Sequence, residues 1–334
     1  MNNTELCNII QNISDNDNFL IVIHDKADGD AVGSSSALAL FLNKLGKRCA
    51  VLSPSVISSR LRFIMSKEVT YIEGKAAFKA SDFKYDYVIS LDVASPQRLG
   101  SLEDCIASEV DMVIDHHRAN TIEAPIKHVD SDASATGEIL FNLFSMYTVT
   151  TGTDVFDTPI CKALFASISS DTGCFKYGNT TSKTHDIASK LMTKGINAEE
   201  INRLLFDTKS LTQIQAEQLG FKNMQMFYDN RLAITVIDMS DLDKIGASED
   251  DTETISQIAR TIEGVQIGVM MREKDYDGKR GYKFSVRTNT DTDISLLCAA
   301  FHGGGHKKAA GCTIFDEKDK ALKAFVEEAE KYLI

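Results

Sequence analysis

The sequence predicts an α/β protein with a mostly parallel sheet in its N-terminal domain, a helical connector and a smaller α+β C-terminal domain. The first half alternates short, nearly continuous apolar runs with stretches of helical spacing, which is typical of strand–helix–strand units in parallel sheets. Residues 181–228 show helical patterning alone, and hairpin-like strands mix with helices after them. We therefore expect domain boundaries at residues 1–190, 191–228 and 229–334.

The elements of the first domain follow from hydrophobic periodicity. Ala31–Leu45 has helical spacing and is followed by Gly46, a residue type that commonly terminates helices. The remaining predictions are strands at Phe19–His24, Arg48–Leu52, Tyr87–Val93 and Met112–Ile114, and helices at Ala135–Met146 and Ile160–Ser169.

The C-terminal third combines both periodicities. We predict a turn at Asp277-Gly278 between two strands. The other expected elements are strands at Arg231–Asp238, Val265–Arg272, Tyr282–Thr288 and Cys312–Phe315, helices at Ile255–Ile262, Asp291–Phe301 and Lys318–Tyr332, and a glycine loop at His302–Gly305.

Composition excludes several classes of protein. The 334 residues suggest two domains, and the net charge of −12 argues against a surface that coats long nucleic acid. No apolar run is long enough to span a bilayer, and Met1–Asp17 is polar and acidic without a signal-like segment. We expect a cytoplasmic protein that does not bind membranes. The seven cysteines are scattered without a C-x-x-C pair, which argues against disulfides and thiolate zinc sites.

Four apolar runs end in acidic or imidazole side chains. The residues at these ends are His24, Asp28 and Asp30, then Asp92, then Asp115, His116 and His117, and finally Asp171. Ligands bind beyond the carboxyl ends of the strands in such sheets, and clustered carboxylates without counter-charge repel one another. We therefore predict a metal site with enough ligands for two ions. Nitrogen and oxygen donors without thiolate suit manganese, cobalt, magnesium or iron better than structural zinc.

Several of these residues have a second interpretation. Asp28 and Asp30 lie on a strand-to-helix loop in which Gly29 permits a tight turn, and Asp30 is positioned to cap the following helix. Neighbouring side chains on an extended segment point apart, so His116 and His117 need not both bind metal. His117 is the better candidate for a phosphate contact or proton donor, and Asp115 for orienting an imidazole.

A glycine-rich segment marks the second domain. Gly303, Gly304 and Gly305 are followed by His306, and consecutive glycines allow backbone N–H groups to wrap an anion. The alternative is a plain tight loop. Arg287, on the predicted strand Tyr282–Thr288, offers a guanidinium fork to a phosphate or carboxylate, or is simply a surface arginine.

These motifs together resemble the DHH family of phosphoesterases. The resemblance rests on His24-Asp-Lys-Ala-Asp28-Gly-Asp30, Leu91-Asp92, Asp115-His116-His117, Ser170-Asp171 and the Gly303–His306 segment followed by Lys-Lys-Ala-Ala-Gly. Motif order is kept over nearly the whole chain, and the length is similar to that of the nanoRNase and pAp-phosphatase subgroup. His302 departs from the further glycine that many members carry.

The resemblance implies two divalent metal ions, manganese first, with magnesium or cobalt as alternatives. It implies His24 and Asp28 on one ion, Asp30, His116 and Asp171 on the other, and Asp92 bridging both. His117 would contact the scissile phosphate. Arg287 and Gly303–His306 would bind the nucleotide or its terminal phosphate.

The implied activity is hydrolysis of short oligonucleotides, dinucleotides or 3′,5′-bisphosphonucleosides (pAp) to mononucleotides by a metal-activated water. One alternative is a manganese-dependent inorganic pyrophosphatase, against which the Gly303–His306 segment argues. A second alternative is a nucleotide-binding sensor without catalysis, which would not need a metal-activated water. The sequence does not predict an oligomeric state.

Overall fold

The computed structural model describes residues 3–248, 250–252, 254–276 and 278–334, and it divides into two compact units. The N-terminal unit is Met1–Thr208 and the C-terminal unit is Lys209–Ile334. The connector predicted at residues 191–228 is therefore divided between the two units. Within it Met224–Phe227 is a strand (β7) where helix alone was expected. This segment has no strand pattern of its own, and its backbone is held as a strand by antiparallel pairing with β8 (Leu232–Ile237).

Six parallel strands form the sheet of the N-terminal unit, which confirms the predicted fold class. In spatial order they are β3 (Thr70–Glu73), β2 (Cys49–Ser53), β1 (Phe19–Val22), β4 (Tyr87–Leu91), β5 (Met112–Asp115) and β6 (Ile126–Val129). The edge strands β3 and β6 were not predicted, because they are short and only partly buried. The chain places β2 and β3 on one side of β1 and β4–β6 on the other, so the direction of winding switches between β1 and β4.

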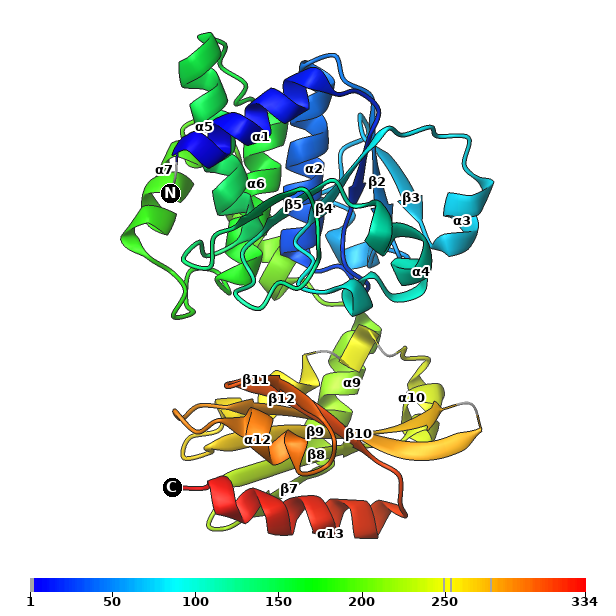
Figure 1. The fold of residues 1–334 in the computed structure, drawn as a ribbon. Helices are drawn as coiled ribbons and strands as arrows, with labels where there is room; N and C mark the ends of the chain where they lie inside the picture. The colour runs from blue at the N-terminus through cyan, green and yellow to red at the C-terminus, as the bar shows by residue number, and fades with distance from the viewer. Residues whose placement is uncertain (1–2, 249, 253, 277) are drawn as a thin grey trace. The chain divides into compact units, whose positions relative to one another are not determined.

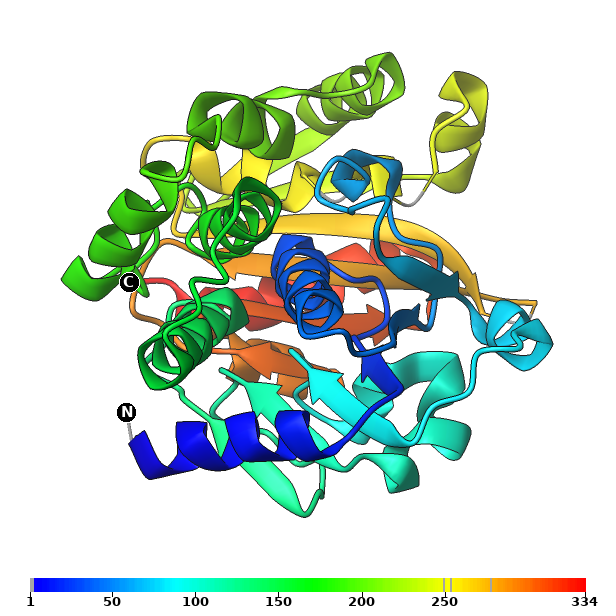
Figure 2. The same ribbon diagram turned by 90° about the horizontal axis from the view of Figure 1, so that it is seen from above.

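Helices cover both faces of this sheet. Phe19 and Ile21 of β1 pack with α1, α2, α5 and α6, whereas Leu20 and Val22 face the layer that contains α4 (Figure 1). Both views place α2 beside α6 (Figure 2). The helices of this unit are α1 (Asn3–Asp15), α2 (Gly29–Lys44), α3 (Lys75–Ala80), α4 (Glu103–Ile106), α5 (Thr136–Thr151), α6 (Thr158–Asp171), α7 (Ser182–Met192) and α8 (Ala198–Asn202). Shorter helical turns are η1 (Ser59–Leu61), η2 (Pro96–Leu102), η3 (Ala107–Glu109) and the π-type turn η4 (Arg203–Asp207).

The C-terminal unit is a second, mostly antiparallel sheet with helices on both faces. Its strand order is β11-β12-β10-β9-β8-β7, and among the residues that the structure describes only β8 and β9 pair in parallel. The bounds not yet given are β9 (Ile267–Tyr276), β10 (Lys279–Thr288), β11 (Gly304–His306), β12 (Ala309–Ile314), α9 (Leu211–Lys222), α10 (Met239–Ile245), α11 (Ile255–Ile258), α12 (Ile294–Ala299), α13 (Lys318–Ala329), η5 (Asp250–Thr252), η6 (Ala259–Thr261) and η7 (Glu330–Tyr332).

The core of this unit lies between the sheet and two of its helices. Phe284 of β10 stacks on Phe325 of α13, with ring centroids 4.4 Å apart. Tyr282, Phe284 and Val286 all face this core, so Lys283, Ser285 and Arg287 lie on the opposite face of β10. Asp277 of the predicted turn lies outside the described residues. Of the helices in the described ranges, none is both long and apolar enough to pass through a membrane.

Candidate metal centre

The acidic and imidazole residues gather where the winding of the N-terminal sheet switches. His24 and Asp28 follow β1, Asp92 follows β4, and His116 follows β5. Asp171 is the last residue of α6, which packs against α2. Open parallel sheets commonly bind ligands at such a switch point, and the tertiary fold brings all the predicted metal ligands to it.

Asp28 rather than Asp30 caps the helix after β1. Helix α2 begins at Gly29, and the Asp28 Oδ1 accepts hydrogen bonds from the backbone N–H groups of Asp30 at 3.0 Å and Ala31 at 3.1 Å. The expected capping role of Asp30 is therefore wrong, because Asp30 already lies inside the first helical turn. The cap uses one oxygen of Asp28, and the other lies 3.7 Å from His24 Nε2.

Three sets of ligand atoms lie close enough together to hold a metal ion, and one of them, Asp92, His116 and His117, shares a residue with each of the other two. His24, Asp28 and Asp92 make one group, with His24 Nε2 3.9 Å from Asp92 Oδ2. Asp30, His116 and Asp171 make another. In this second group His116 Nε2 lies 3.8 Å from Asp30 Oδ2 and 3.5 Å from Asp171 Oδ2. The same nitrogen lies 3.7 Å from Asp92 Oδ1, so Asp92 presents one oxygen to each group.

His24 and His116 are each oriented through Nδ1, the ring nitrogen on the side away from the carboxylates. His24 Nδ1 lies 2.8 Å from the carbonyl oxygen of Asp25, and His116 Nδ1 lies 3.4 Å from that of Ala133. A carbonyl oxygen only accepts hydrogen bonds, so Nδ1 carries the proton in both rings. The Nε2 lone pairs then face the carboxylates, as metal ligands require.

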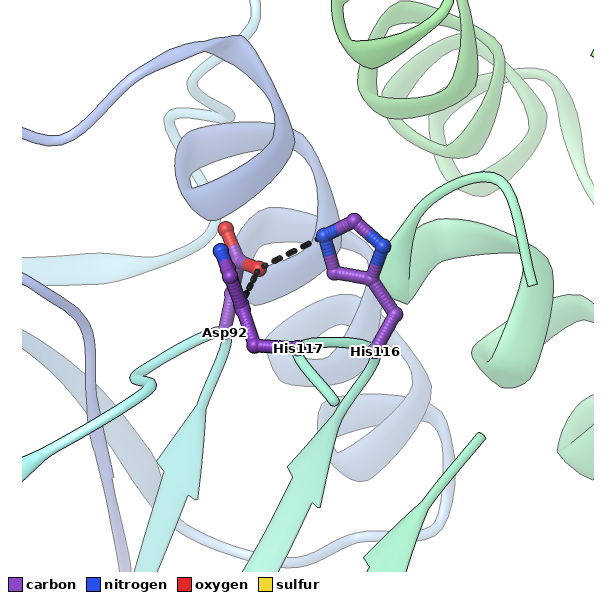
Figure 3. A group of neighbouring side chains, drawn as sticks. All are labelled: Asp92, His116 and His117. Carbon is purple, nitrogen blue, oxygen red and sulfur yellow. Dashed lines mark ion pairs between the residues drawn. The ribbon is translucent and has the colours of Figure 1, made fainter. Parts of the chain in front are cut away.

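His117 has a different environment. Its Nδ1 lies 2.8 Å from Asp115 Oδ1. The same nitrogen lies 3.7 Å from Asp92 Oδ1, and Figure 3 shows these two side chains. The hydrogen bond to Asp115 occupies the nitrogen nearest the other ligands, and Nε2 remains available on a ring that is 31% exposed. This geometry favours contact with a substrate over coordination of a metal.

Asp115 is fully buried and holds the whole turn after β5. It accepts hydrogen bonds from the backbone of His116 at 2.8 Å, from His117 Nδ1, and from Asn120 Nδ2 at 2.6 Å. Burial by itself raises the pKa of this carboxyl, but the contacts with His117 and Asn120 outweigh burial and hold the pKa below its usual value. Asp115 therefore stays ionised beside the imidazole.

Burial raises the pKa of Asp28, but its contacts with His24 and the backbone of Ala31 and Asp30 outweigh burial and lower that pKa, whereas Asp30, Asp92 and Asp171 are not neutralised by the protein itself. Burial raises the pKa of Asp92 and Asp171 well above the usual value, and repulsion from Asp30 and Asp28 adds to the effect. Burial also raises the pKa of Asp30, although His116 opposes the change. Two divalent cations fit this arrangement, because the donors are oxygen and imidazole nitrogen and the carboxylates require counter-charge.

Three buried donors that sequence patterns did not identify hold these carboxylates in place. The Thr136 hydroxyl donates to Asp92 Oδ1 at 3.0 Å, and the Thr136 backbone N–H donates to Asp30 Oδ2 at 2.8 Å. Ser167 of α6 donates its hydroxyl to the other oxygen of Asp30. Gly137 lets α5 approach α6, because a Cβ there would lie 2.0 Å from Ser167 Oγ. The one sequence signal for Thr136 was its place at the start of the helix predicted at Ala135–Met146, where backbone N–H groups are free to bind an acid.

The C-terminal unit contains the other predicted residues. Gly304–His306 is not a loop but the short strand β11, which pairs with β12. Packing requires glycine at two of the three positions: a Cβ on Gly303 would lie 2.3 Å from the Gly311 carbonyl oxygen, and one on Gly305 would lie 2.6 Å from that of Ala309. The Gly303 N–H donates to the Cys298 carbonyl at 2.9 Å and is therefore already hydrogen-bonded.

A hollow of about 600 Å³ lies beside this segment on the sheet. Its polar lining comes from Lys283, Ser285 and Thr313, which the sequence did not single out, together with His302, Gly303 and Gly304. Arg287 lies on the same face of β10 as Lys283 and Ser285. Alternation along a strand would have predicted this shared face once the core side was known.

Two protein-family models match this chain, one in each of its two units. Residues 18–168 match the model of the DHH family N-terminal domain, and residues 229–334 match the DHHA1 domain. The chain belongs to the DHH family. It is a hydrolase, with a DHH domain in its N-terminal unit and a DHHA1 domain in its C-terminal unit.

Two relatives named NrnA match along nearly the whole chain. The bifunctional oligoribonuclease and PAP phosphatase NrnA of Thermus thermophilus is 27% identical over 318 residues, covering 94% of this chain and 89% of that protein. The NrnA of Bacillus subtilis is 25% identical over 319 residues, covering 94% and 95%. The crystal structure of an exopolyphosphatase-related protein from Bacteroides fragilis superposes with a TM-score of 0.88 at 25% identity, covering 99% of this chain and 97% of that one.

Proposed function

We propose that this DHH-family hydrolase is a two-metal phosphoesterase that converts short oligoribonucleotides, dinucleotides and pAp to mononucleotides. The observation that carries the proposal is the pair of donor groups that share Asp92. The names of the NrnA relatives support the substrate class. The net charge of −12 fits a small substrate better than a long polymer.

We assign one cation to His24, Asp28 and Asp92, and a second to Asp30, His116, Asp171 and Asp92. Manganese is our first choice, with magnesium or cobalt as alternatives, because the donors are oxygen and nitrogen. Bound cations would supply a water of lowered pKa and positive charge for the phosphate.

The remaining steps belong to the chain's own residues. Asp115 stays ionised and is bonded to Nδ1 of His117, so an imidazole that also carries a proton on Nε2 has its charge paired with this carboxylate. The Nε2–H of His117 then donates a hydrogen bond to the scissile phosphate or a proton to the leaving oxygen. In the DHHA1 domain we propose that Arg287, Gly303, Gly304, Gly305 and His306 bind an anionic part of the substrate.

The test is a substrate panel with product identification in the presence of manganese. The panel compares a dinucleotide, pAp, a cyclic dinucleotide and inorganic pyrophosphate. We expect mononucleotide products from the dinucleotide and from pAp, and little turnover of pyrophosphate. Rapid turnover of pyrophosphate alone would indicate a pyrophosphatase, and tight dinucleotide binding without product would indicate a sensor.

A further inference from the structure

We propose that Arg98, which lies in η2 after Asp92, binds the phosphate of the substrate at the edge of the metal centre. This inference rests on the proposed function and adds a residue that neither the DHH motifs nor the donor groups include. Its guanidinium Nη2 lies 3.1 Å from Nδ1 of His24, whose Nε2 faces Asp28 and Asp92. Arg98 is thus in contact with a side chain that we assign to the first cation.

The backbone of Arg98 is fixed to the loop after β1. Its carbonyl accepts a hydrogen bond from the Asp25 N–H at 2.6 Å, and the neighbouring Leu99 is fully buried. Gly100 has a φ of +52° and a Cβ there would lie 3.1 Å from the Asp25 side chain, so the turn can close only with glycine. These contacts fix the start of the Arg98 side chain next to His24.

The N–H donors of the Arg98 guanidinium are not used by His24 when that ring is in its metal-binding tautomer. Nδ1 of that ring donates to the Asp25 carbonyl at 2.8 Å, so it cannot also accept from Arg98. Within the described ranges, no carboxylate forms an ion pair with Arg98, and its side chain is exposed. An arginine with available donors at an anion site is suited to bind two phosphate oxygens at once.

The charge of the centre supports the same role. Two divalent cations would balance the four carboxylates of Asp28, Asp30, Asp92 and Asp171, and a substrate phosphate then adds further negative charge. Arg98 would supply a positive charge that attracts this phosphate, on the side of the centre where His24 lies. Lysine would keep that charge but lose the planar pair of donors.

The experiment compares Arg98→Gln, Arg98→Lys and Arg48→Gln with the wild type in manganese. Arg48→Gln is the matched control, because it removes the same charge from an exposed arginine just before β2, at the amino ends of the strands. We measure kcat/KM for a dinucleotide and for pAp, the calorimetric affinity for adenosine 5′-monophosphate, and the manganese dependence of Tm.

We expect Arg98→Gln to reduce kcat/KM and the affinity for the monophosphate by about 10–100-fold, the loss typical of a hydrogen bond to a charged group. Both values for Arg98→Lys should lie between those of the wild type and Arg98→Gln. Arg48→Gln should match the wild type in both values, and the manganese dependence of Tm should be the same in all four proteins. If Arg98→Gln binds the monophosphate as tightly as Arg48→Gln, the inference is wrong even when the wild type is active. A wild type that hydrolyses neither substrate overturns the proposed function instead, and the binding measurement still decides the role of Arg98.

Discussion

Thr136 donates its hydroxyl to Asp92, with 3.0 Å between Oγ1 and Oδ1, and both residues are almost completely buried. The same threonine donates its backbone N–H to Asp30. One residue at the start of α5 therefore orients a carboxylate from each donor group. Helix α5 also points its N-terminus, where the helix dipole is positive, at these acids.

Replacing this hydroxyl tests its role in positioning Asp92. Thr136→Val keeps the shape of the side chain but removes the donor, so the concentration of manganese needed for half-maximal activity should rise about 10–100-fold. Thr136→Ser retains a hydroxyl and should restore most of the manganese affinity. Equal manganese requirements in Thr136→Val and the wild type would contradict the positioning role, whatever the change in Tm.

Asp92→Asn should have opposite effects on stability with and without metal. The pKa of Asp92 is raised in the folded protein, so at neutral pH its ionised form destabilises the fold when no cation is bound. The stabilising protonated form is present at low pH and is lost as the pH rises through that pKa. Asparagine cannot ionise and keeps an acceptor for Thr136. We therefore expect a higher Tm than wild type in chelator.

Added manganese should reverse this order. The wild type should gain Tm with metal, because binding to the folded state alone stabilises it, whereas Asp92→Asn should gain much less and lose hydrolysis. Thermal unfolding of both proteins, each in chelator and in manganese, measures the four values. A wild-type Tm that does not respond to manganese would contradict the metal assignment.

His117→Ala should lower kcat without weakening metal binding. General acid catalysis commonly contributes about 100–10,000-fold, and Nδ1 of His117 is occupied by Asp115 rather than available to a cation. The measurement pairs steady-state kinetics with the manganese dependence of Tm. His185→Gln, an exposed histidine on α7, is the control and should behave as wild type. A large loss of manganese affinity in His117→Ala would instead make His117 a ligand.

Arg287→Gln should raise KM by about 10-fold while kcat changes little, because the substitution removes the charge-assisted contact that we propose for an anionic part of the substrate. Lys323→Gln, on the exposed side of α13, removes the same charge and should leave KM unchanged. Kinetics on a dinucleotide measure both. A normal KM in Arg287→Gln would indicate that this arginine has only a structural role.

Long nucleic acid should compete poorly for the enzyme. The net charge of −12 opposes the electrostatic binding on which polymer affinity depends. An excess of 30-nucleotide RNA should therefore inhibit dinucleotide hydrolysis weakly, at both low and moderate salt. Strong inhibition that disappears as salt is raised would reveal a basic polymer-binding surface.

The sequence by itself determined the chemistry of the centre and the central strands that deliver it. Apolar runs ending in His24, Asp92 and Asp115 predict buried strands with ligands at their carboxyl ends, because burial and ligation leave strong signals in residue type. The edge strands β3 and β6 were missed, because partial exposure removes the continuous apolar pattern. Strand β11 was missed because glycines carry no strand signal, and its backbone is ordered only by pairing with β12.

Only the tertiary structure decided how these residues divide the work. Residue order does not show that Asp115 occupies Nδ1 of His117, that Asp28 rather than Asp30 caps α2, or that Arg98 contacts His24. Nor does it show that Thr136 and Ser167 orient the carboxylates, since threonine and serine in helices are common for many reasons. The physical reason is that hydrogen bonds depend on distances of a few ångströms between segments far apart in the chain, and the packing of α5 and α6 sets those distances.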